Sequence, residues 1–417
     1  MSKVRVGILG AKRGLGLARQ FKAHPEAEVV ALCEKDEVSA RKFLRELGRK
    51  VEVYRDYREL LEHGLDVVVL AGYYPDHAPQ AVEALKRGIN VLSEVCACHT
   101  LAQGVELCRV AEEAQQKGVH YMLAENCCYF NTVQEMGRLY REGAIGELSY
   151  AEGEYIHNGS RIWHIISPYY LHWRDWLPAT YYCTHSLGPI VKITGMRPTK
   201  VVGFVSPNRT GRLYRKMGDD WGVFVLTMEN QAIVRIIAWG YGPMDSTWYR
   251  LYGTEGAMET GRWDGDGRKI ESLLKVHRQK VMEEASVEVY EPPFRRFAEE
   301  ASGAGHGGGD FFVVWEFMEA LAHNRRPPID VYMAMDMTLP GILAYRSALM
   351  GGVPLEVPDF RREDVRRLYE ADTWDPDPRK AGPGDPPPSV LGKVEISEDV
   401  KALLEEKTRR YREESDG

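Results

Sequence analysis

The sequence predicts an α/β protein in which a doubly wound parallel sheet is followed by a second α/β domain with a large, mostly antiparallel open sheet. Up to about Leu123, short runs rich in Val, Ile and Leu alternate with stretches that carry apolar residues at helical spacing. Strands that alternate with helices in this way form a parallel sheet. From about Leu148, longer strand-like runs are separated mostly by short turns, which is the pattern of an antiparallel sheet.

Each expected element follows from these two periodicities. In the first domain we expect strands over Val4–Leu9, Val29–Cys33, Val51–Tyr54, Asp66–Ala71, Asn90–Ser93 and Val119–Leu123. Helices are expected over Leu15–Ala23, Val38–Leu47, Ala78–Arg87 and Ala102–Lys117. The second domain is expected to contain a helix over Thr132–Glu142, then strands over Leu148–His157, Thr199–Val205, Trp221–Met228, Gln231–Trp239 and Trp248–Gly253, then helices over Phe311–Ala322 and Val331–Leu349.

Changes in this pattern divide the chain into residues 1–125, 126–360 and 361–417. The last part is an arm whose proline-rich stretch, Asp375–Leu391, is predicted to be neither helix nor sheet because proline interrupts both. Val400–Tyr411 is expected to form a charged terminal helix. The arm either wraps a partner subunit or is a loosely attached tail.

Composition excludes several classes of protein. A net charge of −7 over 417 residues disfavours nucleic acid and anionic membranes as partners. The longest apolar runs, such as Val67–Ala71, are too short to span a membrane, and the N-terminus enters a strand pattern without a signal peptide, so we expect a cytoplasmic protein. Neither Cys96-Ala97-Cys98 nor Cys127-Cys128 has zinc spacing, so we expect no metal and buried, reduced thiols.

A glycine turn after the first strand predicts a dinucleotide site. The run Gly10-Ala-Lys-Arg-Gly14-Leu-Gly16 joins a strand to a helix, where backbone amides and the helix dipole can hold a pyrophosphate. It departs from G-x-G-x-x-G, because Lys12 replaces the second glycine and Gly14 lies one residue before the third. Glu34, at the end of the second strand, can accept hydrogen bonds from an adenosine ribose and repel a 2′-phosphate, which favours NAD. The first domain is therefore predicted to be a Rossmann domain.

Beyond this turn the chain resembles the glucose-fructose oxidoreductase and inositol dehydrogenase family (Gfo/Idh/MocA) from Val4 to about Phe360. The resemblance depends on Ala71-Gly-Tyr-Tyr-Pro-Asp-His77, Val91-Leu-Ser-Glu94 and Gly143-Ala-Ile-Gly-Glu-Leu148. It implies that a nicotinamide ring lies between the two domains. The family's Glu-Lys-Pro motif reads Glu94-Val95-Cys96 here, and Tyr181 replaces the aspartate of its Asp-x-x-x-His pair.

The substituted motifs resemble a narrower group, glycoside hydrolase family 109. They are Glu125-Asn-Cys-Cys-Tyr129, Gly153-Glu-Tyr155-Ile-His157, Trp173-Arg174, Tyr182-Cys-Thr-His185-Ser-Leu-Gly-Pro189 and Gly305-His306-Gly-Gly-Gly-Asp310. This resemblance implies redox-assisted cleavage of a glycoside with tightly held NAD. A ring hydroxyl, at C3, is oxidised, the anomeric substituent is eliminated after removal of the C2 proton, water adds, and the ketone is reduced again.

The resemblance also implies roles for individual residues. His185 is expected to deprotonate the hydroxyl that is oxidised, Tyr155 to remove the C2 proton, and Tyr182 and Glu125 to position groups or relay protons. Substrate contacts are expected at His157, Trp173, Arg174, His306 and Asp310. Cofactor contacts are expected at Gly10, Lys12, Arg13, Gly14, Glu34, Tyr74, Pro75, His77, Glu94, Val95 and Asn126.

Two other functions stay open. In an ordinary NAD-dependent sugar or polyol dehydrogenase, Tyr182 and His185 would do the work of the missing lysine, and NADH would accumulate. A catalytically silent sugar- or nucleotide-binding protein would bind the cofactor without turnover. A small-molecule carbohydrate or glycoside is the expected partner, and the resemblance implies a homo-oligomer, either a dimer or a tetramer.

Overall fold

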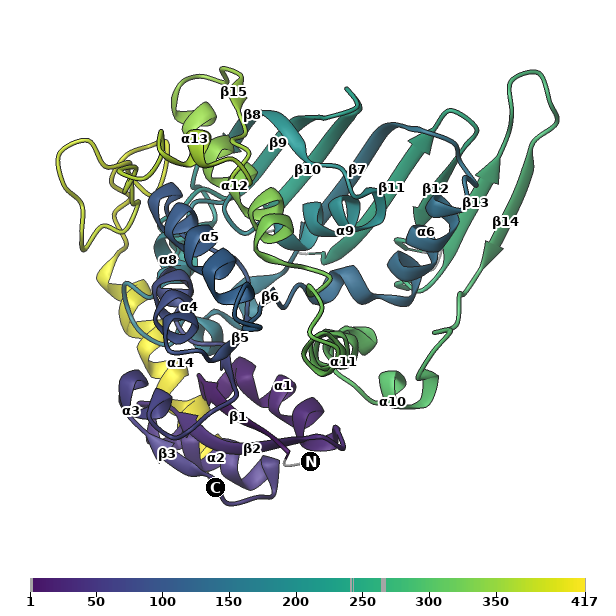
Figure 1. The fold of residues 1–417 in the computed structure, drawn as a ribbon. Helices are drawn as coiled ribbons and strands as arrows, with labels where there is room; N and C mark the ends of the chain where they lie inside the picture. The colour runs from purple at the N-terminus through teal and green to yellow at the C-terminus, as the bar shows by residue number, and fades with distance from the viewer. Residues whose placement is uncertain (1–2, 241, 243, 264–267, 417) are drawn as a thin grey trace.

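The computed structural model describes residues 3–240, 242, 244–263 and 268–416 (Figure 1). The first sheet has six parallel strands in the order β3-β2-β1-β4-β5-β6, the doubly wound order expected for a Rossmann domain. Its strands are β1 (Val4–Leu9), β2 (Ala27–Cys33), β3 (Glu52–Tyr54), β4 (Val67–Leu70), β5 (Asn90–Ser93) and β6 (Tyr121–Leu123). The helices among them are α1 (Ala11–Ala23), α2 (Glu37–Leu47), α3 (Tyr57–Leu61), η1 (Tyr74–Asp76), α4 (His77–Lys86) and α5 (Leu101–Gln115).

A larger second sheet has nine strands in the order β14-β13-β12-β11-β7-β10-β9-β8-β15. All neighbours are antiparallel except β10 and β7, which run parallel. The strands are β7 (Leu148–Ile156), β8 (Pro198–Ser206), β9 (Trp221–Met228), β10 (Ile233–Gly240), β11 (Ser246–Gly253), β12 (Gly256–Thr260), β13 (Leu274–Arg278), β14 (Ser286–Tyr290) and β15 (Leu355–Glu356). The mostly antiparallel open sheet is confirmed.

Helices and irregular segments complete the second domain and the arm. They are η2 (Asn126–Tyr129), α6 (Asn131–Arg141), η3 (Gly159–Arg161), α7 (Trp163–Ile166), α8 (Trp173–Trp176), α9 (Thr184–Thr194), η4 (Gly211–Tyr214), α10 (Ala298–Ser302), η5 (His306–Gly308), α11 (Gly309–Ala322), α12 (Val331–Leu349), α13 (Glu363–Arg366) and α14 (Glu398–Asp416). Helices α9 and α12 pack on one face of the second sheet. The other face exposes a row of apolar side chains, Phe204, Val225, Ile233 and Tyr252.

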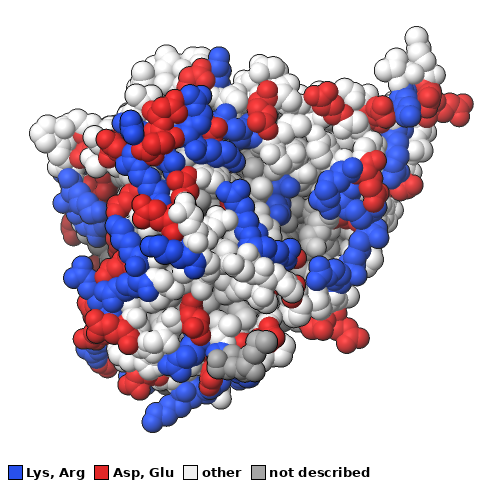
Figure 2. Space-filling model, in the orientation of Figure 1, with Lys and Arg blue, Asp and Glu red and all other residues white. Residues whose placement is uncertain are grey.

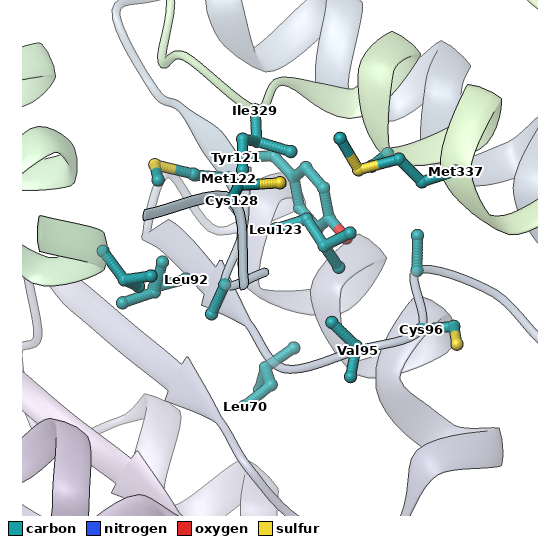
Figure 3. Close-up of a cluster of buried hydrophobic side chains, with 14 of the residues drawn as sticks. Leu70, Leu92, Val95, Cys96, Tyr121, Met122, Leu123, Cys128, Ile329 and Met337 are labelled. Carbon is teal, nitrogen blue, oxygen red and sulfur yellow. The ribbon is translucent and has the colours of Figure 1, made fainter. Parts of the chain in front are cut away.

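One apolar core joins the two domains (Figure 3). Leu70, Leu92 and Val95 of the first domain belong to the same buried cluster as Ile329 and Met337 of the second. The edge strand β6 is tied to the second domain as well, because the Leu123 amide donates to the Ile329 carbonyl at 3.0 Å. The two sheets are therefore held together by a shared interior as well as by the chain between them.

Several expected boundaries were wrong. Helix α1 begins at Ala11, directly after the glycine turn, whereas the apolar pattern starts only at Leu15. Strands β12, β13 and β14 were not predicted; in β14 the first four of five residues are exposed, so burial leaves no alternation in this strand. Helix α9 begins at Thr184, so Tyr182 precedes the helix instead of starting it.

Charged side chains of both signs lie on the surface. On the face drawn in Figure 2, acidic and basic side chains are interspersed. Within the described part of the chain, no helix is both long enough and apolar enough to cross a membrane.

Candidate functional site

The glycine turn forms an open helix N-terminus. Gly10 has φ of 91°, and a Cβ there would lie 2.4 Å from the Ala71 carbonyl oxygen, so only glycine fits this close approach of β1 and β4. Gly10, the N-cap residue of α1, has no side chain that could cap the helix. The carboxylate of Glu34 accepts from the first amide instead, with Oε2 2.9 Å from the Ala11 nitrogen. The other oxygen of Glu34 accepts from the Asp36 amide at 2.9 Å. Glu34 thus braces the turn, while the next amides of α1 remain oriented toward an anion.

An ion network connects this turn to the second domain. The Arg13 guanidinium lies 2.7 Å from Glu94 Oε1 through Nε, and it donates two hydrogen bonds, of 2.9 and 2.7 Å, to Asp310. The His306 ring nitrogen Nδ1 lies 3.0 Å from Asp310 Oδ2. Burial raises the pKa of Asp310, but the hydrogen bonds from His306 and Arg13 outweigh it, so the pKa lies well below its usual range. Asp310 and His306, expected at the substrate, therefore meet Arg13 at the glycine turn.

The turn after β4 presents its backbone, since its side chains are committed to the core. The Tyr74 ring is buried and its hydroxyl donates to the Cys98 carbonyl at 3.1 Å. His77 is 2% exposed, and burial lowers its pKa to about 4, so its imidazole is neutral. Pro75 is also buried, and its carbonyl accepts from Gln103 at 3.3 Å. The cofactor contacts expected at Tyr74, Pro75 and His77 would therefore come from the backbone of this turn.

Val95 and Asn126 lie where the first domain meets the second, Val95 after β5 and Asn126 after β6. Val95 is buried directly after Glu94, and the peptide bond between Val95 and Cys96 is cis. Asn126 opens η2 and is 4% exposed. A Cβ at Gly309 would lie 2.5 Å from the Asn126 carbonyl oxygen, so α11 begins in direct contact with this residue.

The four expected catalytic residues form one cluster: Tyr155 on β7, His185 on α9, Glu125 at the N-cap of η2 and Tyr182 just before α9. The His185 Nδ1 atom lies 2.7 Å from Glu125 Oε1. The ring of Tyr155 lies 4.7 Å from that of His185 and 6.4 Å from that of Tyr182, and the Tyr182 and His185 rings are 5.0 Å apart, centroid to centroid. The backbone of His185 is fixed by the Tyr249 hydroxyl, which donates to its carbonyl at 2.6 Å.

Burial and hydrogen bonding set the protonation states of this cluster. Burial raises the pKa of Glu125, but the charge of His185 and its hydrogen bond lower it by more. The pKa of Glu125 therefore lies below its usual value. An ionised Glu125 only accepts, so His185 donates to it from Nδ1. Burial raises the pKa of both Tyr155 and Tyr182 above the usual value, and the positive charge of Arg174 acts against this rise. Both tyrosines are thus neutral phenols at rest.

The expected substrate residues just after β7 and on α8 join the cluster. The His157 ring lies 6.0 Å from that of Tyr155, with its Nδ1 atom 2.9 Å from Asp245 Oδ1. The Trp173 ring lies 6.1 Å from that of Tyr182, and the Arg174 guanidinium stacks over Trp173 at 4.1 Å. Aromatic faces beside a cation are a common setting for a sugar ring.

Sequence reasoning missed three neighbours of this cluster. Trp239, at the end of β10, lies 4.9 Å from the Tyr182 ring, and together with the buried Lys216 it lines a narrow cavity beside Trp173 and Tyr182. The Cys127 Sγ atom lies 3.5 Å from His185 Nδ1. Of these three residues, only Cys127 could have been found from the sequence, since it lies two residues after Glu125. Trp239 reaches the cluster through the pairing of its strand, and Lys216 through a loop.

Glu125, Cys127 and His185 are also the one group of described residues with metal-ligand geometry, their ligand atoms lying within 4.8 Å of one another. Two ligands of a tetrahedral zinc ion are about 3.3 Å apart. The 2.7 Å separation of His185 Nδ1 and Glu125 Oε1 is shorter and is that of a hydrogen bond. Burial also raises the pKa of the Cys127 thiol well above its usual value, which disfavours the thiolate that a metal needs. All seven cysteines are free and buried.

Two family profiles match separate parts of the chain. Residues 4–122 match the family profile described as oxidoreductase family, NAD-binding Rossmann fold, and residues 216–366 match that of glycosyl hydrolase 109, C-terminal domain. A glycosyl hydrolase family 109 protein of Stenotrophomonas maltophilia is 26% identical over 419 residues, covering 86% of this chain and 89% of its own.

Solved structures show the same fold at low identity. Levoglucosan dehydrogenase in complex with NADH superposes with a TM-score of 0.73 at 18% identity, over 86% of this chain and 100% of its own. An oxidoreductase domain protein from Kribbella flavida gives a TM-score of 0.72 at 19% identity over the same shares. The chain thus combines an NAD-binding Rossmann domain like that of the oxidoreductase family with a C-terminal part that matches the glycosyl hydrolase 109 profile.

Proposed function

We propose that this protein cleaves a glycoside through a redox-neutral cycle. In this cycle the C3 hydroxyl of the sugar is oxidised to a ketone, the C2 proton is removed and the anomeric substituent leaves. Water then adds across the double bond, and the ketone is reduced, so no net oxidation remains. The observation that carries the proposal is the pairing of His185 with Glu125 at 2.7 Å, flanked by Tyr155 and Tyr182, at a site that has Val95 in place of the dehydrogenase lysine.

The residues around the glycine turn fit NAD. Gly10 leaves room for close approach of a pyrophosphate, the first turn of α1 has no acidic residue, and Lys12 and Arg13 add positive charge there. When bound, NAD supplies the hydride acceptor for C3 and returns the hydride at the end of the cycle. The protein's own task is to hold the sugar and to move protons.

His185 suits the first proton transfer. Its Nε2 atom can accept the proton of the C3 hydroxyl as the hydride leaves, and the imidazolium that forms is stabilised by Glu125 across the 2.7 Å hydrogen bond. Glu125 is completely buried, so this charge pair is little screened by water.

Tyr155 suits the second proton transfer, the removal of the C2 proton. The ketone at C3 acidifies the C2 proton, so a weak base is sufficient, and the positive charge of Arg174 favours the phenolate of both tyrosines. The Tyr182 ring, 6.4 Å from that of Tyr155, is near enough to exchange protons with it through a bound hydroxyl or water. Trp173 and Trp239 flank Tyr182 and offer apolar faces to the sugar.

A net sugar dehydrogenase is the second candidate. Levoglucosan dehydrogenase and myo-inositol 2-dehydrogenase from Lactobacillus plantarum share the fold. In that case the His185–Glu125 pair would replace the missing lysine as the base, and every turnover would leave one NADH.

The deciding experiment follows the leaving group and NADH together. The purified protein is incubated with α- and β-linked aryl glycosides, and phenol release is recorded alongside absorbance of NADH. Release without accumulating NADH, lost in His185→Ala and Tyr155→Phe, supports the proposal. Stoichiometric NADH from free sugars, with no release from any glycoside, would establish the dehydrogenase and contradict the cleavage mechanism.

We further propose that the homo-oligomer implied by the family resemblance forms through the uncovered face of the second sheet. Phe204, Val225, Ile233 and Tyr252 are apolar side chains on this face, each 38–55% exposed.

A further inference from the structure

The C-terminal arm, residues 370–416, packs on its own chain at points around the candidate NAD site. Its Asp375 Oδ1 atom lies 2.7 Å from His99 Nε2, in the loop before α5. Arg379 donates to the hydroxyl of Tyr73, at the turn after β4, at 2.9 Å. The proline-rich stretch is therefore anchored, neither helical nor loose.

The terminal helix α14 packs against a second segment, which we call the cover segment: residues 159–177, comprising η3, α7 and α8. Leu404 of α14 is 4% exposed and lies in a small apolar cluster with Trp163 of the cover segment and with Tyr214. The Thr408 hydroxyl donates to the His164 carbonyl at 2.9 Å. A buried leucine and a specific hydrogen bond thus fix α14 to α7.

The same helix reaches the adenosine end of the Rossmann domain. Arg412 lies 3.8 Å from Asp36, the residue that caps the N-terminus of α2. Asp36 in turn donates its amide to Glu34, the candidate ribose ligand. In Figure 1 the yellow helix α14 runs from the arm down to α2, and the C-terminus lies beside the first sheet.

The cover segment lies directly on the glycine turn. Lys12 donates to the Ile165 carbonyl at 3.2 Å, and Arg174 of the same segment donates to the Ile166 carbonyl at 3.1 Å. The order of layers is therefore glycine turn, cover segment and α14. Because Arg412 also holds α14 at Asp36, movement of the cover segment alone away from Lys12 would break its contacts with Leu404 and Thr408.

We propose that α14 is part of the NAD site: Leu404, Thr408 and Arg412 are positioning residues that keep the cover segment closed on the glycine turn and so set the rate at which NAD leaves. A redox-neutral cycle needs the same NAD molecule at its first and last steps, so slow release serves the proposed function. The inference concerns cofactor release alone, which is measured without any sugar; its failure is distinct from failure of the cleavage mechanism.

The test uses the full-length protein loaded with NADH. Release is followed as the loss of bound-NADH fluorescence after addition of excess NAD, at pH 7 and 25 °C. The variant Leu404→Ala with Thr408→Val should release NADH about tenfold faster, which corresponds to about 1.4 kcal/mol. Arg412→Ala, a surface change, should also accelerate release.

Two matched variants separate positioning from general damage. Thr408→Ser keeps the hydroxyl and should restore slow release. Arg410→Ala removes an exposed arginine of the same helix that pairs with Glu406, a residue of α14 itself, and should leave release unchanged. If the double variant keeps its melting temperature without NAD but releases NADH at the rate of the unchanged protein, the proposal is wrong. Should the double variant not fold, an unchanged rate in Arg412→Ala and in Thr408→Val alone would contradict it equally.

Discussion

The hydrogen bond between His185 and Glu125 concentrates the chemistry of the site in one contact. Replacing Glu125 by Gln keeps the shape of the side chain but removes the charge that stabilises an imidazolium. We expect the rate of glycoside cleavage to fall by about 100-fold or more. Initial rates on the best aryl glycoside measure this loss. Glu142→Gln, at an exposed glutamate directly after α6, is the control. An equal loss in both variants would remove Glu125 from the mechanism.

Glu125 should also make stability depend on pH in a defined direction. Its pKa in the folded protein is lowered, so its ionised form contributes stability above the unfolded pKa of about 4.3, and this is lost as pH falls through the lowered folded value. Urea unfolding of the protein and of Glu125→Gln should therefore differ most near pH 7 and converge in acid. A difference that stays constant with pH would contradict this assignment.

Lys216 should act in the same direction, but in a more alkaline window. Burial lowers its pKa to about 7, whereas an unfolded lysine titrates near about 10.4. Between these values the unfolded chain binds the extra proton, so this lysine makes stability rise with pH across the window. In Lys216→Met that rise should disappear and the protein should become more stable at pH 6, as measured by thermal unfolding. Lys42→Met, at an exposed lysine, is the control.

At the scale of elements, the cover segment is held from inside by a buried ion pair. Asp175 and Arg215 are both fully buried, with Asp175 Oδ2 3.2 Å from Arg215 Nε and Asp175 Oδ1 accepting from Trp163 and Ser167. Removing one partner leaves the other charge uncompensated, which costs about 3–5 kcal/mol. Arg215→Met should lose that much unfolding free energy in denaturant titrations. Arg409→Met, which breaks an exposed pair, should lose less than about 1 kcal/mol.

The elements also show what the sequence can predict. Strands such as Val67–Leu70 are continuous apolar runs, so local pattern identifies them. The glycine turn was recognised, but its helix was placed four residues late, because Lys12 and Arg13 give the first turn of α1 no apolar face. Strand β14, at the edge of the sheet, is largely exposed, so its pairing with β13 depends on a neighbour that local pattern does not contain.

The candidate site was predictable where one motif carried two partners. Tyr155 with His157, and Tyr182 with His185, are short-range pairs whose rings do meet. Long-range partners were out of reach. The pairing of Arg13 with Asp310 joins residues 297 apart, and Trp239 reaches Tyr182 only because β10 lies beside β7. Motif resemblance could name Asp310 but could not tell that its carboxylate is committed to Arg13.

At the scale of the whole molecule, the shared core in Figure 3 makes the two domains one cooperative unit. Met337 of α12 is fully buried in the same cluster as Leu70 and Val95 of the first domain. Met337→Ala should cost about 2–5 kcal/mol and lower the unfolding temperature of both domains together. Differential scanning calorimetry measures this. Two resolved transitions, of which only that of the second domain is shifted by Met337→Ala, would mean that the domains unfold independently.

The buried cysteines have a consequence for how the motions of this chain can be followed. Cys33 lies at the end of β2, Cys108 in α5 and Cys183 just before α9, and each thiol is buried with a pKa raised by burial. A thiol-reactive dye can modify such a group only when its surroundings open. The order in which these positions react, resolved by peptide mass, should report which region opens first. Binding of NAD should slow the labelling of Cys33, beside Glu34, more than that of the other two cysteines. The cysteines thus serve as intrinsic probes of local unfolding.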